Sequence, residues 1–101
     1  MPHLYMLDFD DQGEDPAELV TKIVTELRTN FPAVTLEAIS FRGPGGGNPC
    51  AVFMAEPDDW RQFVLGWYCE GSKDSLADYG DEILEPWTKD CPTVGLTAVR
   101  M

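Results

Sequence analysis

The alternation of apolar and polar residues along the chain predicts four strands. Residues 3–9 are apolar on both alternating faces, which is typical of a strand inside a sheet rather than at its edge. Residues 34–42 and 50–55 are rich in strand-favouring side chains, although the alternation of the former slips at residues 38–39. Residues 93–101 alternate again and predict a closing strand.

The first predicted helix has a clear start signal. Asp15 is placed to cap the helix, Pro16 occupies the first helical position, and Glu18 follows three residues after the cap. Apolar residues then recur at spacings of three and four, as one buried stripe requires, until Asn30 and Pro32 end the pattern. The residues of this stripe are Val20, Ile23, Val24, Leu27 and Phe31.

Two further helical segments are predicted after Pro57. The first ends at Gly71, a residue that suits the left-handed conformation found after many helices. Its apolar residues at helical spacing are Trp60, Phe63, Val64 and Trp67. The second is short, and its apolar residues are Leu76, Tyr79, Ile83 and Leu84. Trp87, which follows Pro86 in a predicted loop, either packs against the core or forms an exposed interface anchor.

The predicted order of elements is β-α-β-β-α(α)-β, which matches the split βαβ pattern of ferredoxin-like folds. We therefore expect an α+β fold with a four-stranded antiparallel sheet and helices on one face. The strands at residues 3–9 and 50–55 should lie inside this sheet. The second face, which carries Leu4 and Met6, should be open or partly covered by residues 86–92.

The length of 101 residues suits a single domain that covers residues 1–101 and builds one core. No apolar run approaches the ~20 residues of a membrane-spanning helix, and the first residues lack the pattern of a signal peptide. Cys50, Cys69 and Cys91 are an odd number without C-x-x-C spacing, which indicates neither a disulfide framework nor a zinc site. We expect a cytoplasmic protein without a cofactor.

Charge is distributed very unevenly along this chain, whose formal net charge is -11. Residues 1–18 contain six acidic and no basic side chains, and residues 56–101 contain ten acidic and four basic ones. Residues 19–55 are nearly neutral, with two acidic and three basic side chains. A net charge of this sign opposes direct binding to nucleic acids and anionic membranes, because basic side chains supply that affinity. A basic protein surface is the complementary partner.

Two motifs in the sequence partly resemble known metal-binding and phosphate-binding loops. Asp8, Asp10 and Gly13 resemble the start of a calcium-binding loop, but the position that requires a bidentate Glu falls on Leu19. The glycine-rich residues 43–49 lack the Lys-Ser or Lys-Thr ending of a phosphate-binding loop and precede a strand, so a hairpin loop is expected. Neither motif predicts a metal or phosphate site.

Catalytic patterns are not evident either. The single histidine, His3, has no Cys or Ser motif beside it, and carboxylate pairs carry little information in so acidic a chain. We therefore expect a protein that is not an enzyme.

The leading hypothesis is an acidic interaction domain that uses two carboxylate clusters to bind a basic, nucleic-acid-binding protein. The partner-binding residues of the first cluster are Asp8, Asp10, Asp11, Glu14, Asp15 and Glu18, and those of the second are Asp74, Asp78, Asp81, Glu82 and Glu85. In size and charge the chain resembles small anti-restriction and anti-CRISPR proteins of phages, which implies an inhibitor that mimics DNA. The alternative is a ferredoxin-like structural or regulatory module that dimerises through its open sheet face, with the charge serving solubility alone.

Overall fold

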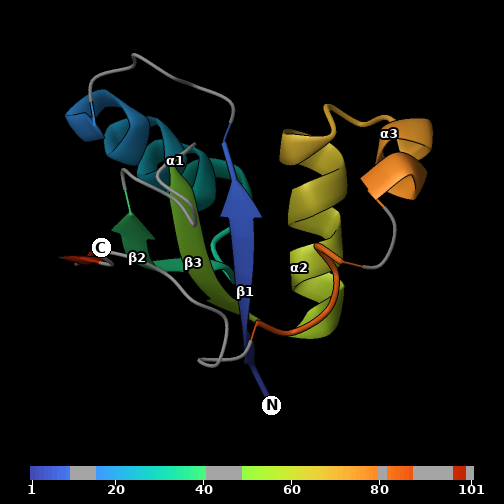
Figure 1. Ribbon diagram of the computed structural model, residues 1–101, viewed down its shortest axis with the longest axis horizontal. Helices are drawn as coiled ribbons and strands as arrows, with labels where there is room; N and C mark the ends of the chain where they lie inside the picture. Colours follow the sequence, from blue (N-terminus) through green and yellow to red (C-terminus); the bar gives the residue numbers. More distant parts are fainter. Residues whose placement is uncertain (10–15, 41–48, 80–81, 88–96, 100–101) are drawn as a thin grey trace.

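A computed structural model describes residues 1–9, 16–40, 49–79, 82–87 and 97–99. Its strands, β1 (His3–Asp8), β2 (Thr35–Ser40) and β3 (Cys50–Ala55), form an antiparallel sheet in the order β1-β3-β2 (Figure 1). The two-residue strand β4 (Thr97–Ala98) pairs with β2. The expected α+β class with an antiparallel sheet is confirmed.

The helices follow the sequence expectations closely but include one irregular turn. Helix α1 (Pro16–Asn30) connects β1 to β2. Helix α2 (Pro57–Phe63) continues directly into the π-helix η2 (Val64–Tyr68), and α3 (Lys73–Tyr79) follows. The predicted third helix is shorter than expected, because Ile83 and Leu84 lie in a turn after it.

The ferredoxin-like topology itself is not shown. In that fold the closing strand lies beside the first strand, whereas β4 lies beside β2 and places β1 at the edge of the described sheet. Beside β2, the backbone N–H of Val99 donates to Glu37 O at 2.9 Å. Beside β1, the backbone N–H of Trp87 donates to Leu4 O at 2.7 Å. Segment 82–87 therefore reaches the edge of β1. Residues 93–96 and 100–101 of the predicted closing strand lie outside the described residues.

Aromatic stacking holds α2 against the sheet. The ring of Trp60 stacks on Tyr5 with centroids 4.7 Å apart and an interplanar angle of 9°, and it also contacts Phe53 and Phe63. Its indole N–H donates to the backbone oxygen of Ile83 at 2.7 Å, so the one polar atom of this buried ring is satisfied. The ring thus joins the core to segment 82–87.

A bulge in β2 explains the slip in its alternation. Leu36 pairs with Phe53 and Ile39 pairs with Ala51, so both face the core although three positions separate them. The register shift lies between Leu36 and Ala38, which leaves Glu37 as the extra residue. Without this bulge, one of the two large apolar side chains would point to the opposite face.

The second face of the sheet is partly covered. Leu4 and Met6 are half-buried there, while Val52, in the middle of β3, is only 3% exposed. Met54 is the exposed position, at 36%. Of the two expected alternatives, an open or a partly covered face, these exposures fit the partly covered one. Trp87 is half-buried beside β1, which favours the packing interpretation of this residue over an exposed anchor.

Candidate functional site

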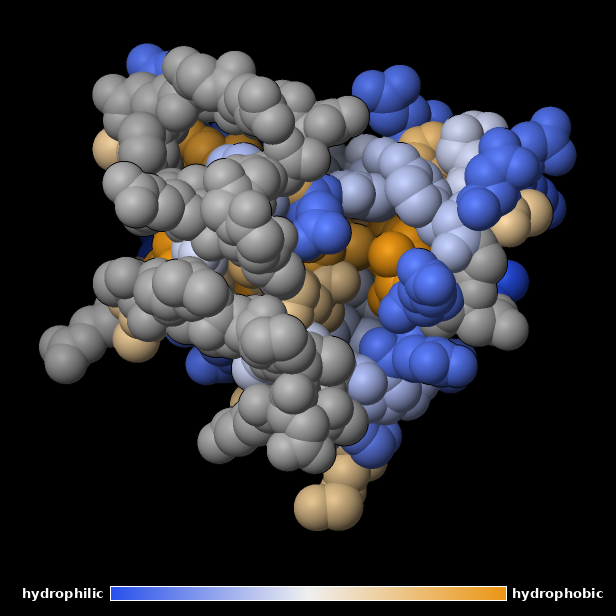
Figure 2. All heavy atoms as spheres, in the orientation of Figure 1, coloured by the Kyte–Doolittle hydropathy of each residue, from blue (hydrophilic) through white to orange (hydrophobic). Residues whose placement is uncertain are grey.

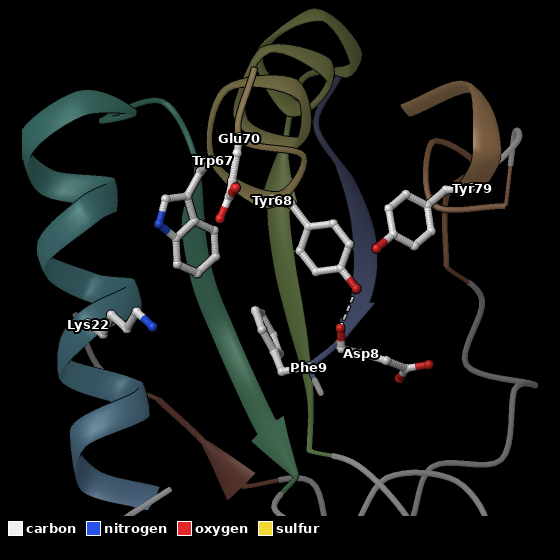
Figure 3. Close-up of a pocket in the computed structure, with 7 residues that line it drawn as sticks. All are labelled: Asp8, Phe9, Lys22, Trp67, Tyr68, Glu70 and Tyr79. Carbon is white, nitrogen blue, oxygen red and sulfur yellow. Dashed lines mark hydrogen bonds between the residues drawn. The ribbon is translucent and has the colours of Figure 1, made fainter. Parts of the chain in front are cut away.

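Acidic residues from two distant parts of the sequence line one cleft of about 400 Å³. Asp8, the last residue of β1, lines one part of it, and Glu70, which follows η2, lines another (Figure 3). Both carboxylates are on exposed residues. Residues far apart in the sequence therefore contribute to one concave surface, of a volume that falls within the usual range of binding pockets.

Aromatic rings form most of the remaining lining. Phe9 is almost fully buried, Trp67 and Tyr68 are half-buried, and Tyr79 is 45% exposed. The centroid of Phe9 lies 6.0 Å from that of Trp67 and 5.9 Å from that of Tyr68, and Tyr68 and Tyr79 are 5.3 Å apart. These separations lie within the range of direct aromatic contact. The rings therefore form one connected apolar surface with Tyr79 at its solvent edge.

The π-helix positions two of these rings. The backbone N–H of Cys69 donates to Val64 O at 2.8 Å, a bond across five residues that widens the last turn. Trp67 and Tyr68 both belong to this wide turn and both line the cleft. Glu70 and Gly71 then adopt left-handed conformations, with φ of 52° and 81°, and reverse the chain beside the cleft. The predicted end of the helix at Gly71 is confirmed.

Tyr68 links this turn to β1. Its hydroxyl group donates a hydrogen bond to the backbone oxygen of Asp8. Burial, followed by the electrostatic influence of Tyr79 and Asp8, raises the pKa of Tyr68 well above its usual range. The phenol therefore stays protonated at neutral pH and remains a hydrogen-bond donor.

Among the described residues that line the cleft, Lys22 of α1 is the one with a basic side chain. Figure 3 shows its ammonium group pointing from the helix towards Trp67 and Phe9. Lys22 is exposed, and no ion pair joins it to a carboxylate of the described residues. The cleft thus combines two carboxylates, one ammonium group and four aromatic rings, an arrangement suited to binding a group with both charge and flat apolar surface.

Further predicted residues lie near this cleft. Glu18 is in the first turn of α1, and Asp74 and Asp78 are on α3; all three are exposed. Figure 1 shows that β1 ends, α1 begins and α3 lies on the same side of the molecule, the upper side of that view. In the same orientation, hydrophilic residues gather over α3 (Figure 2). We call this surface the acidic end and define it by Asp8, Glu18, Glu70, Asp74 and Asp78.

The remaining predicted residues do not all join the acidic end. Glu82 and Glu85 are exposed, but they belong to segment 82–87, whose Trp87 is bonded to Leu4 near the opposite end of β1. The backbone therefore carries this segment away from Asp8. The other predicted partner-binding residues lie outside the described residues; these are Asp10, Asp11, Glu14, Asp15 and Asp81. The glycine-rich residues 43–48 lie outside them as well.

The carboxylates of the acidic end are not neutralised by basic side chains of the described chain. The one ion pair found among the described residues joins the N-terminal amine of Met1 to Glu56 at 3.2 Å. The basic residues on the same helices are Lys22, Arg28 and Lys73, and none of them forms an ion pair with a carboxylate of the described residues. The negative charge is consequently available to a partner.

Sequence reasoning missed the aromatic residues of the cleft. Trp67 keeps the helical spacing of a core residue with Phe63, and the two rings stack with their centroids 5.3 Å apart. The available signal is the pair Trp67-Tyr68 at the end of a helix, followed two residues later by Glu70. Among the described residues, no group of three His, Cys, Asp or Glu side chains could hold a metal ion. None of the described helices has the length and apolar character needed to cross a bilayer.

Comparison with known proteins adds no family assignment. The chain matches no protein-family model, and neither the curated proteins nor the solved structures give a significant match.

Proposed function

We propose that this protein is a non-enzymatic interaction domain whose acidic end binds a basic surface on another protein. The observation that carries the proposal is that exposed acidic residues of both predicted clusters, together with Glu70, lie on elements at one side of the fold (Figure 1). Asp8 and Glu70 line the same cleft, and Asp74 and Asp78 extend the charge along α3. Since these carboxylates have no ion-pair partners in the described chain, they favour an external cation.

A basic nucleic-acid-binding protein fits this surface best. The proposed DNA mimic requires carboxylates that substitute for phosphates, and the exposed carboxylates of Asp8 at the end of β1 and of Asp74 and Asp78 on α3 support this role. Such complementary fields accelerate encounter and reject acidic partners, and added salt weakens them. In this proposal the protein acts in the cytoplasm as an inhibitor that occupies the nucleic-acid site of its partner. It binds neither nucleic acid nor membrane directly.

Two variants with equal changes in charge test the proposal. The first replaces Glu18, Asp74 and Asp78 by Gln, Asn and Asn at the acidic end. The control replaces Glu26, Glu82 and Glu85 by Gln, which removes the same charge elsewhere on the described surface. Tagged wild-type protein and both variants are used to capture proteins from a host lysate at low and high salt. Each captured protein is then purified, and its binding is measured with and without competing duplex DNA.

The proposal expects a basic partner that is lost from the acidic-end variant, is retained by the control, and is displaced by DNA or salt. Equal capture by both variants, or capture that salt does not affect, would contradict it. Thermal unfolding of the variants shows whether each is folded under the binding conditions.

A second candidate, the ferredoxin-like structural or regulatory module that dimerises, rests on one observation. Met54 is exposed on the second sheet face and pairs with the half-buried Leu4. Association through this apolar pair would survive high salt and neutralisation of the acidic end. Sedimentation of wild type and Met54→Lys at high salt distinguishes this candidate, because only the substitution should then produce a monomer.

A further inference from the structure

We infer that the cleft accommodates the guanidinium group of an arginine side chain from the basic partner. This inference rests on the proposed function and specifies how the acidic end recognises its partner. It is carried by the aromatic lining of the cleft, by the two carboxylates beside that lining, and by the lysine that points into it (Figure 3).

The aromatic surface is suited to a flat cation. The faces of aromatic rings are electronegative, and they attract cations placed within about 6 Å of the ring centre. Tyr79 is 45% exposed, and Trp67 and Tyr68 remain partly accessible beside it. A guanidinium group is planar and weakly hydrated, so it stacks on such rings more readily than an ammonium group does.

The carboxylates give the cleft its preference for a cation. Asp8 and Glu70 belong to different elements and lie on different parts of the lining. A carboxylate can accept two parallel N–H bonds from a guanidinium group, which an ammonium group cannot supply in the same geometry. Aromatic stacking together with a carboxylate therefore selects arginine over lysine.

Lys22 shows that the cleft tolerates a cationic group near its rings. Its ammonium points towards Trp67 and Phe9 in Figure 3. An incoming arginine would be repelled by this group, but Lys22 is exposed and can move away. Glu18 and Glu26 lie one helical turn on either side of it, so each offers an alternative partner on the surface of α1. Lys22 therefore acts as a weak internal competitor for the arginine.

The cleft is held in shape before a partner arrives. The hydrogen bond from Tyr68 to Asp8 O fixes the π-helix to β1, and the stacking of Trp67 on Phe63 fixes the second ring. Rings that are already placed lose little conformational freedom on binding, which favours affinity.

The test compares an oligoarginine peptide with an oligolysine peptide of equal length, by calorimetric titration at low and at high salt. Tyr79→Ala removes the exposed ring, Tyr79→Phe retains it as the matched control, and Lys22→Ala removes the internal competitor. Because Tyr79 is 45% exposed and lies at the edge of the core, its substitution should leave the protein folded, and amide NMR spectra check this directly.

We expect the arginine peptide to bind about fivefold more tightly than the lysine peptide, as a partly exposed cation–π contact predicts. Tyr79→Ala should remove this preference, Tyr79→Phe should keep it, and Lys22→Ala should strengthen binding of the arginine peptide. Equal affinities for both peptides, or a preference unchanged in Tyr79→Ala, would overturn the inference.

The inference and the proposed function fail in different ways. If both peptides bind equally and the Glu18, Asp74 and Asp78 variant weakens both, the cleft inference fails while charge-based recognition stands. If the arginine preference depends on Tyr79 but the lysate experiment yields no basic partner, the proposed function fails and the cleft retains its selectivity for the free peptide.

Discussion

The Tyr68 hydroxyl group donates a hydrogen bond to the backbone oxygen of Asp8 and thereby joins the π-helix to the end of β1. This contact brings Asp8, a member of the first acidic cluster, to the same cleft as Glu70, which follows Tyr68 by two residues. It also places a phenol ring between Phe9 and Tyr79. The cleft therefore depends on a tertiary contact between the end of β1 and the π-helix η2.

Removal of this hydrogen bond should destabilise the protein modestly. Tyr68→Phe retains the ring but loses the donor, and we expect the free energy of unfolding to fall by about 1 kcal/mol, the usual value of a hydrogen bond at a partly exposed site. Urea unfolding measures this change. Asp8→Asn is the matched control, because it keeps the backbone acceptor, and it should leave stability nearly unchanged. An equal loss in both variants would assign the effect to the Asp8 side chain instead.

Alkaline pH should destabilise the fold through its buried phenols. Burial is the main cause that raises the pKa of Tyr5 and Tyr68. In the unfolded chain tyrosine ionises near pH 10, so above about pH 10 the unfolded state releases protons that the folded state retains. The stability that these groups contribute is therefore intact below about pH 10 and is lost as the pH rises further.

The measurement for the alkaline effect is the free energy of unfolding from about pH 8 to about pH 11. Tyr68→Phe removes one of the two groups and should flatten the decline relative to wild type. A decline of equal steepness in the variant would show that Tyr68 does not contribute to it.

The thiols of Cys50 and Cys69 should be unreactive in the folded protein. Both residues are buried and free, and burial raises the pKa of each thiol, with Asp8 adding to the effect at Cys50. Fewer thiolates form at neutral pH, and a reagent has little access to them. In a Cys91→Ser background, a disulfide reagent should react slowly with native protein and rapidly after denaturation. Rapid labelling of either thiol in native protein would contradict the burial.

Gly71 should be intolerant of a side chain for a reason that is purely conformational. Its φ is 81°, while a Cβ added there would meet nothing within 4 Å. Gly71→Ala should therefore cost about 1 kcal/mol through backbone strain alone. Thermal unfolding measures the loss. Gly66→Ala tests the opposite case, a close contact without backbone strain. Its added Cβ would lie 3.1 Å from the Phe31 ring, and Gly66 has no positive φ.

Part of the fold was predictable because it depends on local pattern. The start of α1 at Pro16, the burial of Ile23 and Leu27 and the end of the helical segment at Gly71 follow from the proline at the first helical position, from periodicity and from backbone preference. The slip near Ala38 also appeared in the sequence, and the structure explains it as a bulge. In each case the deciding interactions lie within a few residues of one another.

The position of β1 in the sheet and the lining of the cleft were not predictable in the same way. Two apolar faces suggested an interior strand, but Leu4 and Met6 are half-buried at an edge that segment 82–87 reaches through Trp87. Trp67 satisfied the helical pattern equally well as a core residue and as a cleft residue. Hydrophobic periodicity reports which side chains avoid water and does not report which element covers them.

The sequence by itself determined the α+β class, the helix boundaries set by caps and glycine, and the concentration of acidic side chains in two separate blocks. The tertiary structure alone decided that Asp8 and Glu70 line one cleft and that Glu82 and Glu85 are carried away from it. The physical reason is that charge is a property of each residue, whereas proximity between blocks depends on long-range packing. Here the Tyr68 hydroxyl and the stacked rings of Trp60 and Tyr5 establish that packing.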